Sequence, residues 1–346
     1  MPDIADGSKP TPWLRVAIVA AVIGISLTLT VAPDRVQATA EFVLWGLVAV
    51  APLIIPGIIL AAWISASGAG DWIAEAFNGR LLHTVVIASL IGAITPVCGV
   101  TVLPLMASLL ASGVPLAPVM AFWLSSPITD PAMLAATAAT LGLSFAVGKT
   151  LAAFGLGIFG GIATAALAGR SWTYQPLRNS RLVGKLGQRI HCGSASFTAA
   201  VWRSPEGRAR FLLEAKATTR LILICLVPAF AAEYWLNEML QPEALSAYVG
   251  NDVWWAVPFA VFVGAPAYLD GYAALPLTRA LIDHGMSQGA AMAFLVSGGV
   301  VSIWGAMAIF PVLKPKPFLL YLGLAIVGSI VSGWAFELAA PLLQSR

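Results

Sequence analysis

Two aspartates lie in strongly apolar stretches, where burying a charge costs about 2.5–3.5 kcal/mol even on a lenient insertion scale. Asp130 precedes Pro131, and Asp270 precedes Gly271. At such helix breaks, exposed backbone N–H groups can bind a carboxylate, and a protonated acid can donate a hydrogen bond. Both aspartates are therefore candidates for proton coupling or cargo binding. The alternative is that each only caps a helix or completes a turn.

Thiol, phenol and hydroxyl groups near the same breaks are further candidates. Cys98 could bind a soft, thiophilic cargo, although a buried cysteine often acts as a small apolar residue. Tyr268 and Tyr272 flank Asp270 and could donate hydrogen bonds or only pack. Five hydroxyls at a second pair of breaks could replace the water shell of a cargo or cap freed carbonyls: Ser125, Ser126, Thr129, Ser297 and Ser302.

Proline and glycine predict the helix breaks themselves. Proline removes a backbone donor and clashes with the preceding turn, and glycine permits an unwound backbone. At bilayer depth, unpaired backbone groups are tolerated only where they line a cavity or are buried in protein. The breaks therefore mark where a cargo site could form. The residues that produce them are Pro96, Gly99, Pro127, Pro131, Gly271, Gly298 and Gly299.

An internal repeat relates the breaks to each other. Shifting the sequence by 172 positions places Leu103-Pro104-Leu105 on Leu275-Pro276-Leu277 without a gap. We call this shift the repeat offset. Nine of the 24 positions from 103 to 126 are identical in this register. Cys98 then takes the position of Asp270. We therefore predict two related halves with broken or re-entrant helices at the membrane midplane, the usual construction of secondary carriers.

The elements that position these residues must lie in a bilayer. The chain has 346 residues, of which 59% are hydrophobic and 10% charged, and its mean hydropathy is +0.87. An ordinary soluble domain carries roughly a quarter charged residues. This composition excludes a soluble dehydrogenase, a nucleic-acid binder and a secreted disulfide scaffold. We expect the lipid bilayer to be the main partner of the chain.

Apolar runs of about 20 residues predict an all-α polytopic membrane protein with seven to nine hydrophobic segments. Making one broken segment in each half re-entrant leaves about seven crossings and an amino terminus in the cytoplasm. The predicted divisions are an amino-terminal segment with the first transmembrane helix (1–41), a first membrane repeat (42–168), a basic cytoplasmic loop (169–213) and a second membrane repeat (214–346).

Charged residues outside the breaks have simpler interpretations. Ten of the 19 basic residues lie from Arg170 to Arg220, against two acidic residues, which places this segment in the cytoplasm. A topological role is the simplest interpretation, and binding of lipid headgroups is the alternative. Lys149 lies in an apolar run and could snorkel to an interface. Arg279 and Asp283 have the i, i+4 spacing of a helical ion pair.

Four runs of sequence resemble the signatures of the ArsP/YraQ-type permease family. In the first half these are Pro-Val-Cys-Gly-Val-Thr-Val-Leu-Pro-Leu (96–105) and the Ser-Ser-Pro-Ile-Thr-Asp-Pro run that ends the stretch 113–131. In the second half they are Tyr-Leu-Asp-Gly-Tyr-Ala-Ala-Leu-Pro-Leu (268–277) and the stretch 289–298. The resemblance covers about residues 42–343. It implies a permease that exports a small, soft, largely uncharged solute, such as the trivalent organoarsenical methylarsenite.

Two departures from the family pattern affect the cargo. Members often have a Cys-Ser-Cys-Gly-like run at the first break, whereas this chain has one cysteine, Cys98. Asp130 stands where the family more often has asparagine. Loss of the thiol pair weakens the arsenical assignment, and the added carboxylate favours proton coupling or a cationic or protonatable cargo.

The leading hypothesis is a multi-pass permease in the inner membrane of a prokaryote. It would export a small-molecule substrate by alternating access between the two halves, coupled to protons, and a homo-oligomer is compatible with it. We expect no enzymatic activity, cofactor or metal site, and the phosphate-binding Gly-x-x-x-x-Gly-Lys-Ser/Thr motif is absent. The alternatives are a passive channel and an intramembrane aspartyl hydrolase in which Asp130 and Asp270 share a proton.

Overall fold

The computed structural model describes most of the chain, and its described part is nearly all helical. Outside the helices, strand pairing in these residues amounts to one bridge between Leu177 and Leu313. The predicted all-α class is therefore confirmed for this part of the chain. The described residues are 33–67, 80–95, 102–111, 113–129, 131–178, 198, 200–239, 255–264, 274–301, 306, 309–310 and 312–344.

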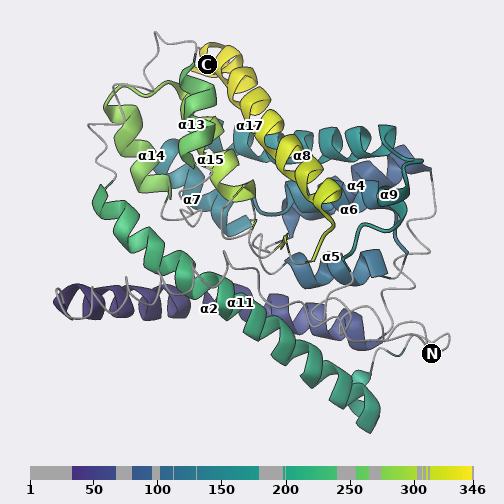
Figure 1. The fold of residues 1–346 in the computed structure, drawn as a ribbon. Helices are drawn as coiled ribbons and strands as arrows, with labels where there is room; N and C mark the ends of the chain where they lie inside the picture. Colours follow the sequence, from purple (N-terminus) through teal and green to yellow (C-terminus); the bar gives the residue numbers. More distant parts are fainter. Residues whose placement is uncertain are drawn as a thin grey trace, which may run out of the picture.

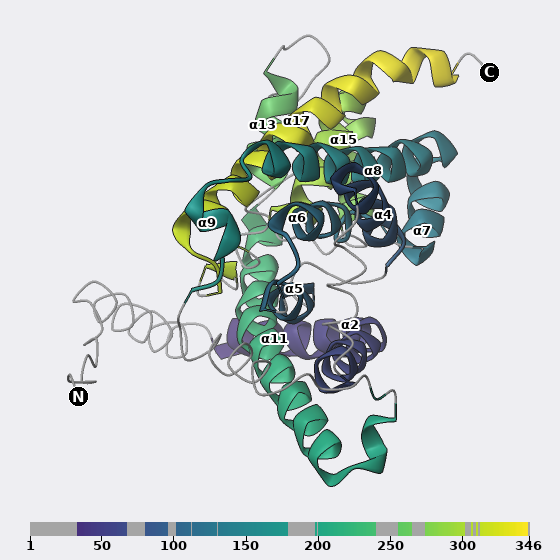
Figure 2. The ribbon, with the colours of Figure 1, turned by 90° about the vertical axis from the view of Figure 1, so that its right-hand side faces the viewer.

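The described helices form a bundle with a crossed pair beside it. In two perpendicular views, α2 and α11 cross each other on one side, and the other helices pack together above them (Figure 1 and Figure 2). The helices are α2 (Pro33–Ser67), α4 (Leu81–Ile94), α5 (Val102–Ala111), α6 (Leu116–Ser125), α7 (Pro131–Leu141), α8 (Leu143–Ala166), α9 (Ser171–Tyr174), α11 (Pro205–Met239), α13 (Ala256–Gly264), α14 (Ala274–Asp283), α15 (Gln288–Val300) and α17 (Pro315–Gln344), with a 3-10 turn at Val201–Arg203.

Helices end where the sequence predicts breaks. The apolar stretch 81–111 divides into α4 and α5, and the stretch 117–141 divides into α6 and α7. In the second half, α13 ends at Gly264 and α14 begins at Ala274. In the segment 169–213, which is predicted as a basic cytoplasmic loop, residues 205–213 are helical, because α11 begins at Pro205. Proline without a donor N–H is well suited to the first turn of a helix.

Helix bounds recur at the same repeat offset that relates the sequence motifs. Both α2 and α11 have 35 residues, and they begin at Pro33 and Pro205. The helices α5 and α14 each have 10 residues, over 102–111 and 274–283. The long helices α8 and α17 begin at Leu143 and Pro315.

The ends of α5 and α14 have the same turn geometry. Gly113 and Gly285 adopt positive φ angles of 86° and 100°, a conformation that glycine adopts without steric cost. After Gly113, the N–H of Val114 donates to the carbonyl of Leu109 at 3.1 Å, and after Gly285 the N–H of Met286 donates to that of Leu281 at 2.9 Å. Both helices therefore end in a Schellman-type turn, which satisfies carbonyls that the helix leaves open.

Two groups of three helices pack closely through glycine: α4, α6 and α8 in the first half, and α13, α15 and α17 in the second. A Cβ on Gly161 of α8 would lie 3.0 Å from the Cβ of Ala121, and one on Gly333 of α17 would lie 2.7 Å from that of Ala293. The repeat offset relates Gly161 to Gly333 and Ala121 to Ala293. Small residues let helix backbones approach closely without lipid or water between them.

Two helices of the described part are long and apolar enough to cross a membrane, Leu143–Ala166 and Pro315–Ala340. They are α8 and most of α17, which pack against each other. Their outward faces carry exposed apolar side chains, including Leu151, Phe159 and Val331. Apolar side chains on the outside are what a helix in contact with lipid requires. The count of seven to nine segments stays a prediction.

Candidate functional site

The described residues include part of the predicted site. They contain Ser125, Ser126, Pro127, Thr129 and Pro131 of the first half, and Ser297, Gly298 and Gly299 of the second half. The other predicted site residues lie outside the described residues: Pro96, Cys98, Gly99, Asp130, Tyr268, Asp270, Gly271, Tyr272 and Ser302.

The break after α6 lies against the end of α15. A Cβ on Gly299 would be 2.9 Å from the carbonyl oxygen of Pro127 and 3.5 Å from the Cα of Ile128. Because a backbone carbonyl cannot retreat as a flexible side chain does, this contact requires glycine at position 299. The repeat offset carries Pro127 onto Gly299, so matching positions of the two halves touch each other here.

Buried serine hydroxyls stand at the last turn of α6 and in α15. Ser125 donates from its hydroxyl to the carbonyls of Ala121, at 2.9 Å, and Phe122, at 3.1 Å. Ser297 donates to the carbonyl of Phe294 at 3.2 Å. Both hydroxyl protons therefore bond to the serine's own helix, which is the carbonyl-capping arrangement, and the oxygen lone pairs are left as acceptors.

Each of these serines packs against a glycine that lies two helices earlier in the chain. A Cβ on Gly264 of α13 would lie 2.6 Å from the Ser297 Oγ and 2.8 Å from the carbonyl oxygen of Phe294. A Cβ on Gly92 of α4 would meet the Ser125 Oγ and the carbonyl oxygen of Phe122 in the same way. Ser126 and Thr129, in the following break, are also buried. Ser125 and Ser297 thus lie at tight helix crossings.

The sequence interpretation of Lys149 as a snorkelling residue is wrong. Its side chain is only 2% exposed, on the same face of α8 as the fully buried Ala146 and Ala153, and it makes a polar or electrostatic interaction. Burying the charge of a lysine in an apolar run carries the same free-energy cost as burying that of an aspartate. This cost, read from the sequence, could have identified Lys149 as a buried residue with a partner. Its counterpart at the repeat offset is Tyr321 of α17.

Tyr321 connects three helices at the contact between the halves. Its hydroxyl donates to the carbonyl oxygen of Val300, at the end of α15, at 2.6 Å. Its ring stacks on Trp123 of α6, with centroids 4.4 Å apart and planes 24° apart. Within the described residues, the buried Trp123 Nε1 has no hydrogen-bond partner. A buried donor without a hydrogen-bond partner costs about 1–3 kcal/mol of stability. The contact between Tyr321 and Trp123 therefore contains one unsatisfied polar group.

Other charged residues have structural partners. Glu337 of α17 accepts a hydrogen bond from the N–H of Gly289, in the first turn of α15, where the helix dipole favours a carboxylate. The predicted ion pair between Arg279 and Asp283 is confirmed, with an N–O distance of 3.0 Å. Among the described residues, no three histidine, cysteine, aspartate or glutamate side chains form a group that could hold a metal ion.

Comparison with known proteins gives matches over most of the chain. A family model described as a predicted permease matches residues 35–338. A UPF0718 protein of Methanocaldococcus jannaschii is 23% identical over 327 residues, and the match covers 80% of this chain and 90% of that relative. No solved structure matches the chain. The matched range includes α4 to α15 and both sets of helix breaks.

Proposed function

The chain belongs to the ArsP-type family of predicted permeases, and on that premise we propose that it carries a small solute through the interface between two structural repeats. The contact between Pro127 and Gly299 is the observation that carries this proposal. It joins the break after α6 to the last turn of α15, at matching positions of the two halves, and carriers built from repeats place their cargo site at broken helices between the repeats. Membership of a permease family favours a membrane transporter over an enzyme.

The proposed repeats are residues 42–168 and 214–346, which the basic segment 169–213 connects on the cytoplasmic side. The recurrence of helix bounds and of glycine contacts at the repeat offset supports this division. The chain then crosses the inner membrane of a prokaryote several times, and its positive segment remains inside. Rocking of one repeat against the other would expose the central site alternately to the two sides.

Proton coupling is assigned to Asp130 and Asp270. Thr129, which precedes Asp130, belongs to the described break after α6, and Pro131, which follows Asp130, begins α7. A carboxyl group in an apolar setting holds its proton more tightly than in water, and an approaching charge or a change of solvation can release it. Exchange of this proton with the cargo would couple export to the proton gradient.

The proposed cargo class is a small trivalent organoarsenical such as methylarsenite. Trivalent arsenic is a soft, thiophilic centre, and Cys98 supplies one thiol at the first break. In the proposed repeat register, Cys98 corresponds to Asp270, so one break would offer a soft ligand and the other a carboxyl group. The cargo would thus meet a thiol from one half and a proton site from the other.

Replacing Cys98 by serine should remove protection against methylarsenite. In an arsenic-sensitive bacterial host, we expect the wild-type chain to raise the tolerated methylarsenite concentration and Cys98→Ser to lower that gain about tenfold, because serine is a poor ligand for a soft centre. The matched control is Cys225→Ser in α11, which should protect like the wild type. Equal protection by Cys98→Ser and the wild type would exclude a ligand role for Cys98, and no protection by either would exclude this cargo; both results would leave the fold unaffected.

A further inference from the structure

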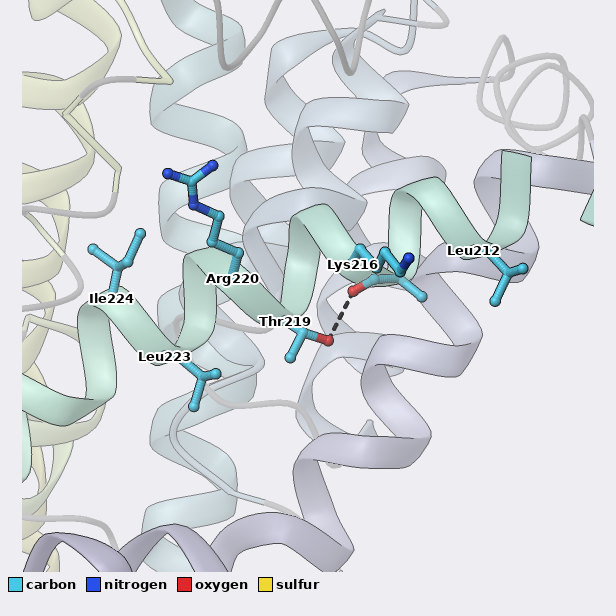
Figure 3. A pocket seen from close by; sticks show the side chains of 7 residues that line it. Leu212, Lys216, Thr219, Arg220, Leu223 and Ile224 are labelled. Atoms are coloured by element: carbon cyan, nitrogen blue, oxygen red, sulfur yellow. Dashed lines mark hydrogen bonds between the residues drawn. The ribbon is translucent and has the colours of Figure 1, made fainter. Parts of the chain in front are cut away.

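A shallow groove runs along the amino-terminal half of α11, outside the proposed transport site. It has a volume of about 450 Å³, and Leu212, Lys216, Arg220, Leu223 and Ile224 are among the residues that line it. This part of α11 extends beyond the other helices in both overall views (Figure 1 and Figure 2). Figure 3 shows the lining side chains arranged along successive turns of the one helix, with Arg220 extending away from its axis.

Two cations are adjacent in this groove without an anion between them. Lys216 and Arg220 have i, i+4 spacing, both are exposed, and neither makes an ion pair within the described residues. Like charges at this spacing destabilise a helix. The nearest acidic residue in sequence, Glu214, is buried and already has a partner. The pair is therefore a site at which a bound anion would relieve repulsion.

Before Arg220, exposed cations alternate along α11 with exposed leucines such as Leu212, whereas the exposed side chains described after Arg220 are apolar. Leu223 and Ile224 are 44% and 59% exposed, and Val227 on the next turn is 41% exposed. In a membrane protein, such a change from cations to exposed apolar side chains along one helix marks the boundary between headgroups and acyl chains. A ligand that fits both parts carries a negative group at one end and a hydrocarbon chain at the other.

We propose that this groove binds an anionic phospholipid of the cytoplasmic leaflet, with the lipid phosphate at Lys216 and Arg220 and an acyl chain along Leu223 and Ile224. The planar guanidinium of Arg220 can donate two parallel hydrogen bonds to phosphate, and Lys216 adds a compact charge. Thr219 donates its hydroxyl to the carbonyl of Ala215 at 2.8 Å, so the cations supply the donors. An acidic protein would match the charges but leave the apolar end without a partner.

Native mass spectrometry of the purified full chain with added lipid tests this proposal without any cargo. The probes are phosphatidylglycerol, phosphatidylcholine and inorganic phosphate, and the variant is the double substitution Lys216→Gln/Arg220→Gln. The matched control, Arg208→Gln/Arg210→Gln, removes two exposed cations from the same helix outside the groove. Both variants change exposed residues, and melting temperatures equal to that of the wild type will establish that they fold.

We expect the wild type to bind phosphatidylglycerol more tightly than phosphatidylcholine, and the groove variant to lose roughly thirtyfold in affinity for phosphatidylglycerol. The control should lose much less, and inorganic phosphate should not compete. Equal losses in the two variants, unchanged lipid binding in the groove variant, or competition by phosphate would each overturn the proposal. Unchanged lipid binding in the groove variant would indicate an acidic protein as the partner of this groove instead.

Discussion

Replacing Gly264 by alanine is expected to prevent α13 and α15 from packing and to lower the yield of folded protein sharply. The added Cβ would lie 2.6 Å from the Ser297 Oγ and 2.8 Å from the carbonyl oxygen of Phe294. The carbonyl is fixed within a helix, so the helices must separate. Overpacking of this kind costs about 3 kcal/mol. Thermal unfolding of the detergent-purified protein, followed by circular dichroism, measures the loss.

The chain offers a matched control for this substitution. Gly155 of α8 is also helical, and among the described residues no atom outside its own stretch of helix lies within 4 Å of the position its Cβ would take. Gly155→Ala should therefore leave the melting temperature unchanged or raise it slightly, because alanine favours the helix. Gly92→Ala should destabilise as Gly264→Ala does, because its Cβ would meet the equivalent serine. A melting temperature for Gly264→Ala equal to that of Gly155→Ala would contradict the close crossing.

Replacing Lys149 by methionine should have the second large effect. Lys149 is buried and has a partner, and methionine has similar length without the charge. Removal of one member of a buried polar contact leaves the other unsatisfied and costs about 3 kcal/mol or more. We therefore expect a large fall in melting temperature together with a loss of methylarsenite export from cells.

An exposed lysine provides the comparison for Lys149. Lys316→Met removes the same charge from the exposed first turn of α17, where surface substitutions usually change stability by less than about 0.5 kcal/mol, and it should leave export unaffected. If Lys149→Met unfolds at the wild-type temperature, its ammonium group makes no important buried contact. The burial of Lys149 in α8 would then have no energetic role.

The helix breaks were predictable from the sequence because proline and glycine act locally. The ends of α4 and α6 fall where those residues interrupt apolar runs, and the Arg279–Asp283 pair follows from spacing within one helix. The repeat offset was likewise visible in identical short motifs. Each of these features depends on a few residues that are close in sequence, so the local sequence is sufficient to predict it.

The contacts between helices could not be predicted in this way. Periodicity tells which residues share a face, but the helix that covers this face depends on how the whole bundle packs. For this reason Lys149 could be expected at an interface and is instead buried, and the stacking of Trp123 on Tyr321 had no local signal. The roles of Cys98, Asp130 and Asp270 stay predictions, since these residues lie outside the described part of the chain.

Proton flux driven by methylarsenite in proteoliposomes tests the central proposal most directly. Purified protein is reconstituted with an internal pH dye, a methylarsenite gradient is applied, and arsenic and proton movement are recorded together. The control is Asp283→Asn, which removes a carboxylate from an exposed ion pair. A proton-coupled permease should move both species in the wild type and the control, whereas Asp270→Asn should lose the proton flux. Unaltered arsenic and proton movement in Asp270→Asn would contradict the account.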